Sequence, residues 1–144
     1  MNVNAQAKSR LGSCAWSVEE GRGAFFPADL RPERWIEFYA RYFPAVELDS
    51  TFYQAPSEES VLRWAESTPA SFRFACRLPR AITHACELRD CTPELTAFLK
   101  VMEPLAEKLR VIHIQLPPSF APDAGRPALR TFLEQLPPAF RYAV

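Results

Sequence analysis

Three segments of the chain alternate apolar and polar residues with a period of two, which is the pattern of β-strands that bury one face. They are Ala45–Ser50, Ser71–Leu78 and Val111–Leu116. Two shorter apolar segments, Leu11–Ser17 and Phe140–Val144, predict a first strand and the start of a fifth. The apolar positions of the alternating strands are Val46 and Leu48, then Phe72, Phe74, Cys76 and Leu78, then Ile112, Ile114 and Leu116. We expect these side chains to face a layer of helices.

Segments with helical spacing separate the predicted strands. Their starts are marked by Pro32, by Ser57 as an N-cap before two acids, by Pro93 and by Pro127. Pro104 is expected to kink or end the third helix. The apolar positions at helical spacing are Trp35, Phe38, Tyr39 and Tyr42; Val61, Leu62, Trp64 and Ala65; Leu95, Phe98, Leu99 and Met102; and Leu129, Phe132, Leu133 and Leu136. Strand and helix therefore alternate four times, which predicts a parallel sheet with right-handed crossovers.

The polar positions of the strands distinguish between two kinds of parallel sheet. An open doubly wound sheet packs helices on both faces and is apolar on both, and no G-x-G-x-x-G motif follows the first strand. Here one face is polar, as in the interior of a (β/α) barrel. The inward positions are Glu47, Asp49, Arg73, Ala75, Arg77, His113 and Gln115. We therefore predict an α/β, TIM-barrel-like fold, represented by about half a barrel: four βα units and the start of a fifth strand.

Length and composition indicate one globular domain without a strong overall charge. The chain has 144 residues, 48% of them hydrophobic, and 17 basic residues balance 17 acidic ones. This balance excludes a large electrostatic footprint for nucleic acid or an anionic membrane. We predict a flexible tail over residues 1–10, without the apolar core of a signal peptide, and a single domain over 11–144.

The cysteines and histidines argue against a structural metal or disulfide framework. Four cysteines occur without a C-x-x-C pair, and the chain contains only two histidines. We predict reduced thiols, no metal site and a cytoplasmic location. No apolar run reaches the length of a membrane span, so no membrane partner is expected.

Four motifs carry a resemblance to a known family. They are G-S-C-A-W-S at Gly12–Ser17, V-E-L-D-S-T-F-Y at Val46–Tyr53, F-R-F-A-C-R-L-P-R-A-I-T-H at Phe72–His84 and Q-L-P-P-S-F at Gln115–Phe120. In this order and spacing they resemble the YecE-like proteins, a TIM-barrel family of unknown function. Members of the family are much longer and continue into an E-F-R-H type block, so the resemblance implies the N-terminal half of a barrel.

Three residues depart from the pattern of the family. Ala15 stands where the family usually has glycine, Asp49 where asparagine is common and Arg77 where lysine is more usual. The last change keeps the charge but alters its geometry, because a guanidinium is a planar fork of donors.

Barrel enzymes work at the C-terminal ends of their strands, which gives ten candidate ligand-binding residues. They are Trp16, Glu47, Asp49, Ser50, Thr51, Tyr53, Arg77, Arg80, His84 and Gln115. Glu47 and Asp49, two apart on one strand and roughly 7 Å apart along it, form either an acid/base or metal-ligating pair or an ionic network with Arg73 and Arg77.

The other candidates also have two interpretations each. Ser50, Thr51 and Tyr53 either bind a phosphate or sugar or form a strand-end turn. Arg77, Arg80 and His84 either form an anion site around one loop, or Arg77 pairs with an acid and His84 fixes the loop. Trp16 is better explained as a plug at the top of the barrel, and Gln115 orients a ligand or a neighbouring acid.

The function favoured by these residues is binding of a small polar or anionic ligand at the strand ends, with hydrolase or lyase chemistry if the protein is an enzyme. The sequence identifies no cofactor. One alternative is a nucleic-acid-binding barrel, against which the neutral charge argues. Another is an inactive truncated fragment, whose open sheet edges would favour self-association.

Overall fold

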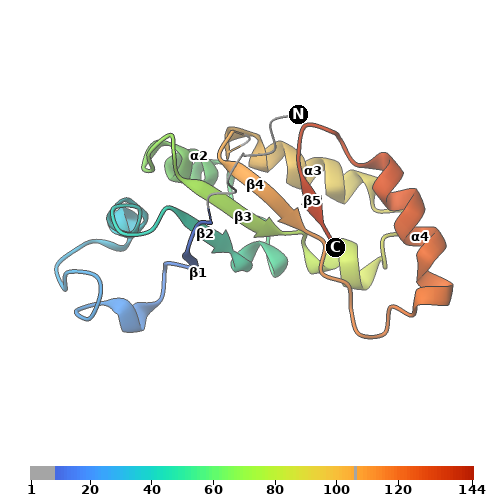
Figure 1. The fold of residues 1–144 in the computed structure, drawn as a ribbon, viewed down its shortest axis with the longest axis horizontal. Helices are drawn as coiled ribbons and strands as arrows, with labels where there is room; N and C mark the ends of the chain where they lie inside the picture. The colour runs from blue at the N-terminus through green and yellow to red at the C-terminus, as the bar shows by residue number, and fades with distance from the viewer. Residues whose placement is uncertain (1–8, 106) are drawn as a thin grey trace, which may run out of the picture.

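A five-stranded parallel sheet forms the centre of the structure, a computed structural model that describes residues 9–105 and 107–144. Its strands are β1 (Gly12–Cys14), β2 (Ala45–Leu48), β3 (Arg73–Arg77), β4 (Leu109–His113) and β5 (Tyr142–Ala143). They lie in the order β1-β2-β3-β4-β5, so each strand pairs with its neighbour in the sequence (Figure 1). This is the strand order of half a (β/α) barrel, since a doubly wound sheet reverses its order at a switch point.

Helices connect the strands and supply the second layer. They are α1 (Trp35–Tyr39), α2 (Glu58–Glu66), α3 (Thr92–Met102) and α4 (Pro122–Gln135). Short 3₁₀ turns lie at Glu19–Gly21, Pro32–Arg34, Asp49–Phe52 and Glu103–Leu105, and a π-helical turn at Ala81–Ala85. Figure 1 shows α2 and α3 behind the sheet. The predicted α/β fold is therefore confirmed.

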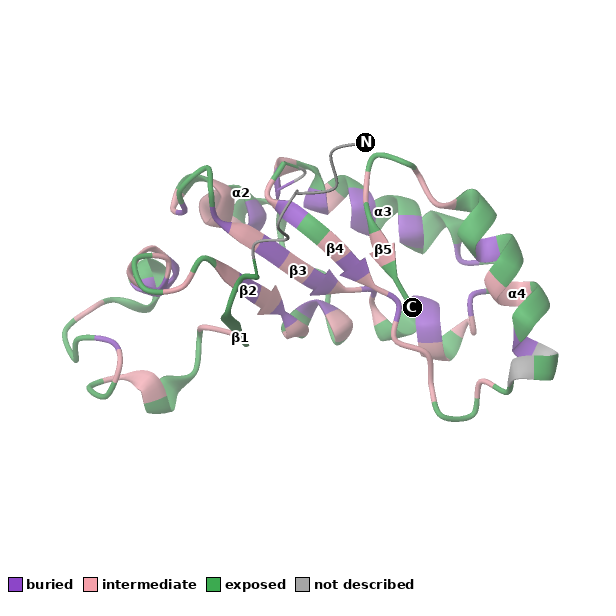
Figure 2. Ribbon diagram, viewed as in Figure 1, coloured by how far each residue is buried: buried purple, intermediate pink, exposed green. Residues whose placement is uncertain are grey.

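The two faces of the sheet differ as the alternation predicts. Buried and half-buried residues alternate along β2 and β3, whereas in β4 the exposed Arg110 and the half-buried Val111 separate the buried Leu109 and Ile112 (Figure 2). We call the buried side the core face; its strand residues are Val46, Leu48, Phe74, Cys76, Leu109 and Ile112. They form one apolar cluster with helix residues such as Trp35, Phe98 and Phe132. We call the other side the open face; it carries Cys14, Glu47, Ala75, Arg77, Val111 and His113.

The boundaries of all five strands differ from the predicted ones, and those of β2 and β4 are the most informative. The strand predicted over Ala45–Ser50 ends at Leu48, because a 3₁₀ turn begins at Asp49. The fourth strand begins at Leu109, two residues before the predicted Val111, and its register with β3 shifts at Phe74/Ala75. The register shift is a β-bulge, which alternation alone does not reveal.

Helix starts were predicted with mixed success. The Ser57 side chain accepts a hydrogen bond from the Ser60 amide at 3.2 Å, which confirms the N-cap of α2. The last helix begins at Pro122, so the predicted start, Pro127, lies inside it. Leu62 and Leu133 were expected in the buried faces and are 43% and 40% exposed.

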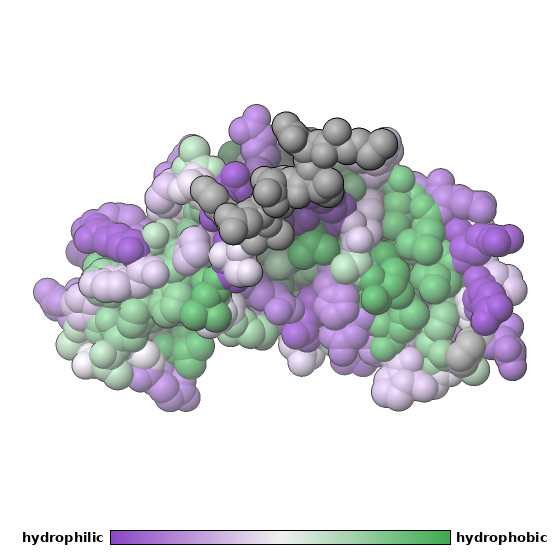
Figure 3. All heavy atoms as spheres, in the orientation of Figure 1, coloured by the Kyte–Doolittle hydropathy of each residue, from purple (hydrophilic) through white to green (hydrophobic). Residues whose placement is uncertain are grey.

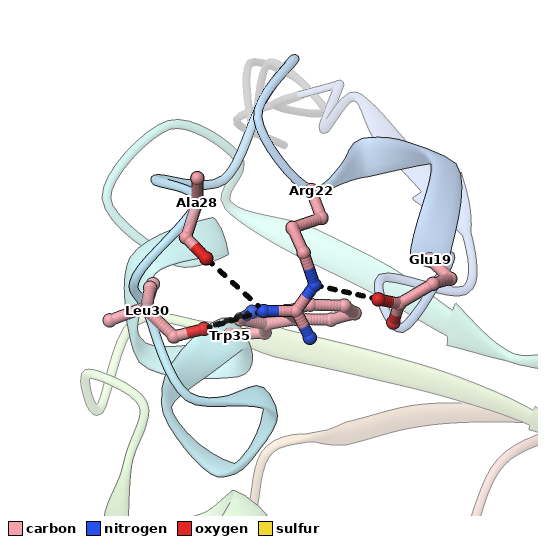
Figure 4. A network of polar contacts seen from close by, with 5 residues as sticks. All are labelled: Glu19, Arg22, Ala28, Leu30 and Trp35. Carbon is pink, nitrogen blue, oxygen red and sulfur yellow. Dashed lines mark hydrogen bonds and ion pairs between the residues drawn. The ribbon is translucent and has the colours of Figure 1, made fainter.

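A compact set of polar contacts organises the long β1–α1 connection (Figure 4). The Arg22 guanidinium binds Glu19 at 2.6 Å, lies within 3.5 Å of the carbonyl oxygens of Ala28 and Leu30, and is 5.0 Å from the centre of the Trp35 ring. Trp35 donates its indole N–H to the Leu30 carbonyl. These contacts tie the Glu19–Gly21 turn and the segment from Ala28 to Leu30 to the start of α1.

Candidate functional site

The centre of the candidate site is an ion pair between neighbouring strands. The Nε of Arg77 on β3 donates to Oε1 of Glu47 on β2 at 2.7 Å. About a quarter to a third of each side chain remains exposed, 26% for Arg77 and 32% for Glu47. The bond to Glu47 raises the pKa of the Arg77 guanidinium, which stays charged. The pair therefore fixes a guanidinium in one orientation on the open face.

A thiol and a second carboxylate lie beside this ion pair. Cys14 is opposite Glu47 in the β1–β2 register, and the carboxylate of Asp49, at the start of the turn after β2, also acts on its thiol. Burial raises the pKa of the Cys14 thiol, and the charges of Glu47 and Asp49 raise it further, against the effect of Arg77. We call Cys14, Glu47, Asp49 and Arg77 the carboxylate–arginine cluster.

The 3₁₀ turn after β2 is held by a buried hydroxyl rather than by a ligand. Thr51 Oγ1 lies 2.7 Å from the Leu48 carbonyl oxygen and 2.8 Å from that of Arg77, and it accepts the Arg77 amide N–H at 3.1 Å. Thr51 is fully buried, whereas Ser50 is exposed and Tyr53 is 70% exposed. The strand-end turn is therefore the role that the structure supports for Thr51.

Three residues were predicted to surround one loop and make separate contacts in the structure: Arg77, Arg80 and His84. His84 sits in the π-helical turn, where its Nδ1 is 2.9 Å from the Thr83 hydroxyl and its ring packs edge-on against Phe52. Arg80 and Tyr53 line a groove of about 340 Å³ beside α3. Within the described part of the chain, neither Arg80 nor His84 shares a hydrogen bond or ion pair with Arg77.

The remaining candidates have mainly packing contacts. Trp16 is half-buried and packs edge-on against Trp64 of α2, with ring centres 5.3 Å apart. Gln115 is half-buried just after β4. Arg73 donates to the carbonyl oxygens of Ala70 and Phe72, so the expected network between the two acids and both arginines contains Arg77 but not Arg73.

Sequence reasoning missed Cys14 as a member of the cluster. Its neighbours become visible only when β1 is paired with β2 in the observed register, because Cys14 and Glu47 are far apart in the chain. Among residues 9–105 and 107–144, no group of three or more His, Cys, Asp or Glu side chains is arranged to hold a metal ion. The same residues include no helix with the length and apolar character needed to cross a membrane.

Known proteins share both the sequence and this arrangement of strands. Residues 10–144 match the family described as "Protein of unknown function DUF72". The UPF0759 protein YecE of Escherichia coli strain K12 is 44% identical over 109 residues, which is 76% of this chain and 40% of YecE.

Two crystal structures of DUF72 family proteins are similar to this fold. The protein from Thermotoga maritima superposes with a TM-score of 0.77 at 28% identity, over 93% of this chain and 54% of that one. The protein from Enterococcus faecalis gives a TM-score of 0.66 at 26% identity, over 92% of this chain and 49% of that one. The chain thus spans about half or less of the length of these relatives. It belongs to the DUF72 family, the YecE-like proteins of unknown function.

Proposed function

We propose that this chain contributes the first strands of a TIM-barrel site that binds a small anionic ligand at their carboxyl ends. The observation that carries the proposal is the geometry of Arg77. Its Nε is bound to Glu47 at 2.7 Å, and among the described residues its two terminal nitrogens have no hydrogen-bond partner. A guanidinium held in this way presents a fork of donors that matches a carboxylate or phosphate group.

The two carboxylates, Glu47 and Asp49, have different roles in this proposal. Glu47 is engaged with Arg77 and acts as a positioning residue, whereas Asp49 carries the carboxylate available for proton transfer. An anion held by Arg77 beside a carboxylate base suits hydrolase or lyase chemistry. The four unpaired cysteines agree with a reducing compartment, and we place the activity in the cytoplasm.

The proposal is tested by screening small anions against matched variants. Thermal shifts with sugar phosphates and hydroxy acids are measured for the wild-type chain, Arg77→Gln, Glu47→Gln and the control Arg130→Gln on the exposed surface of α4. We expect the stabilising anions to lose their effect in Arg77→Gln and to be weakened in Glu47→Gln, while Arg130→Gln responds like wild type. Equal responses in all four proteins would refute the site.

Completion of the barrel requires further strands, and the sheet edges suggest how the chain behaves alone. β1 and β5 are the two end strands, and among the described residues no further strand pairs with their outer sides, although the Tyr39 hydroxyl accepts the Ser13 amide N–H of β1 at 2.8 Å. We propose that isolated chains associate through these edges, as the completing half of a longer barrel would. Light scattering should give a mass above that of one chain; a stable folded monomer would contradict this part of the proposal.

A further inference from the structure

The amino-terminal end of the open face gathers positive charge around a cavity. The cavity has a volume of about 310 Å³, and its described lining includes Arg10, Arg73 and Arg110. The acidic side chain in that lining is Glu47, which already binds Arg77 at 2.7 Å. Three guanidinium groups therefore surround a space whose only described carboxylate is engaged elsewhere.

Backbone carbonyl groups hold two of these arginines in place. Arg10 Nη1 donates to the Ser71 carbonyl at 3.2 Å, and Arg73 Nη1 donates to the carbonyl groups of Ala70 and Phe72, both at 2.7 Å. Each of these guanidiniums thus uses one nitrogen for anchoring and keeps further N–H groups for a ligand. Arg110 is exposed. Within residues 9–105 and 107–144, none of the three forms an ion pair with a carboxylate.

The pKa of the neighbouring Lys108 reflects the same excess of positive charge. Its ammonium donates to the carbonyl groups of Ala65 and Thr68 at the end of α2. Burial lowers the pKa of Lys108, and the charge of Arg73 lowers it further. Residues 1–8 and 106 contain no Asp or Glu, so those parts of the chain have no carboxylate to offer.

We propose that this cavity is a second binding site, specific for a compact polyvalent oxyanion held by Arg10, Arg73 and Arg110. Arginine grips such groups through paired N–H donors, and several arginines around one cavity favour a ligand with more than one negative group. The site lies toward the amino-terminal ends of the strands. Its lining shares Cys14 and Glu47 with the carboxylate–arginine cluster but does not include Arg77.

Titration calorimetry with inorganic pyrophosphate and with citrate tests this site on the 144-residue chain at low ionic strength. We expect one anion bound per chain and weaker binding as salt is added. The Arg110→Gln variant should bind about tenfold more weakly or worse, because a charge-assisted hydrogen bond is lost. Pyrophosphate and citrate distinguish a phosphate-selective site from one that accepts any polyvalent anion.

Three further variants make the result specific. Arg73→Gln should weaken binding as Arg110→Gln does; because Arg73 also anchors a loop, the exposed Arg110 remains the decisive position if Arg73→Gln fails to fold. Arg130→Gln, a control on the exposed surface of α4, should bind like wild type. Arg77→Gln leaves Glu47 unpaired in the lining and should weaken binding less than Arg110→Gln does. Absence of saturable binding, or equal weakening by Arg130→Gln, would overturn the inference. Binding that depends on Arg77 but not on Arg110 would also overturn it while supporting the proposed function.

Discussion

The core face and the open face of the same strands are held in place by different forces. On the core face, Val46, Phe74 and Ile112 are at most 2% exposed and are fixed by packing in one apolar cluster. On the open face, Glu47 and Arg77 keep about a quarter to a third of their side chains exposed and are fixed by a directional bond of 2.7 Å. Stability therefore resides mainly on one face, which leaves the other free to carry charge.

Hydrophobic and hydrophilic side chains are also separated on the surface. In Figure 3 a hydrophilic area over the middle of the molecule lies between two hydrophobic areas. Apolar side chains on the core face gain free energy by leaving water, at about 25 cal/mol for each Å² buried. A partly exposed ion pair contributes little free energy by comparison, because solvent screens the attraction between its charges. Substitutions on the two faces should consequently have effects of different size.

The largest difference is expected between neighbouring residues of β4. Ile112→Ala removes a fully buried side chain from the core face and should lower the free energy of unfolding by about 2–5 kcal/mol. Val111→Ala, on the open face, should lower it by less than about 1 kcal/mol. Urea denaturation of both variants measures the contrast. Equal losses would show that the open face is packed as tightly as the core face.

Cysteines on opposite faces give the next contrast. Cys76 is fully buried on the core face, and burial strongly raises the pKa of its thiol; Cys14 is exposed. Iodoacetamide should therefore modify Cys14 in the native protein and Cys76 only after unfolding, as read by peptide mass spectrometry. Native modification of Cys76 at the rate of Cys14 would contradict the assignment of faces.

The buried Cys76 thiol should lower the stability of the folded protein at alkaline pH. Folded Cys76 keeps its proton at a pH where the unfolded thiol has lost it, so the unfolded state binds fewer protons. Stability is then fully present below the unfolded thiol pKa and falls above about pH 8.5, by up to about 1.4 kcal/mol for each pH unit. Urea denaturation at several pH values should show a shallower fall for Cys76→Ala. An unchanged slope would assign the pH dependence to other groups.

A smaller effect is expected when the ion pair of the open face is broken. Glu47→Gln removes a partly exposed carboxylate and should cost less than about 1 kcal/mol of folding free energy. It should nevertheless weaken anion binding, because Arg77 loses its fixed orientation. Denaturation and thermal-shift measurements on the same samples separate the two effects. A loss of several kcal/mol would give Glu47 a core role.

The smallest effect is expected at the turn after β1. Ala15 adopts a positive φ of 73°, a conformation that favours glycine. Ala15→Gly relieves this strain but adds freedom to the unfolded chain, so we expect a net gain of about 0.5 kcal/mol. A loss of stability in urea denaturation would mean that the alanine methyl group makes a compensating contact.

The sequence predicted the faces of the strands better than the positions of the strand ends. Alternation identified Val46 and Leu48 as core residues and Glu47 as an open-face residue, because burial imposes a period of two. It placed Asp49 on the strand, whereas the buried Thr51 hydroxyl bends the chain into a 3₁₀ turn there. The hydrogen bonds of Thr51, two of which join it to the Arg77 backbone on the next strand, leave no periodic signal.

The sequence predicted only part of the candidate site, because some of its contacts depend on the tertiary structure. The pairing of Glu47 with Arg77 followed from their places on adjacent parallel strands. The sequence also grouped Arg77 with Arg80 and His84, but the π-helical turn at Ala81–Ala85 carries His84 to Phe52, and Arg80 lines the groove beside α3. Contacts made by such a turn depend on the tertiary structure and cannot be obtained from spacing.

The proposed function depends on the orientation of the Arg77 guanidinium, which side-chain NMR measures most directly. In a proton–nitrogen spectrum of the arginine Nε–H groups, the Arg77 signal should exchange slowly with water, because its proton is bound to Glu47 at 2.7 Å. Glu47→Gln should make that exchange markedly faster and leave the Arg110 signal unchanged. An Arg77 Nε–H that exchanges as fast as that of Arg110 in the wild-type protein would contradict the account.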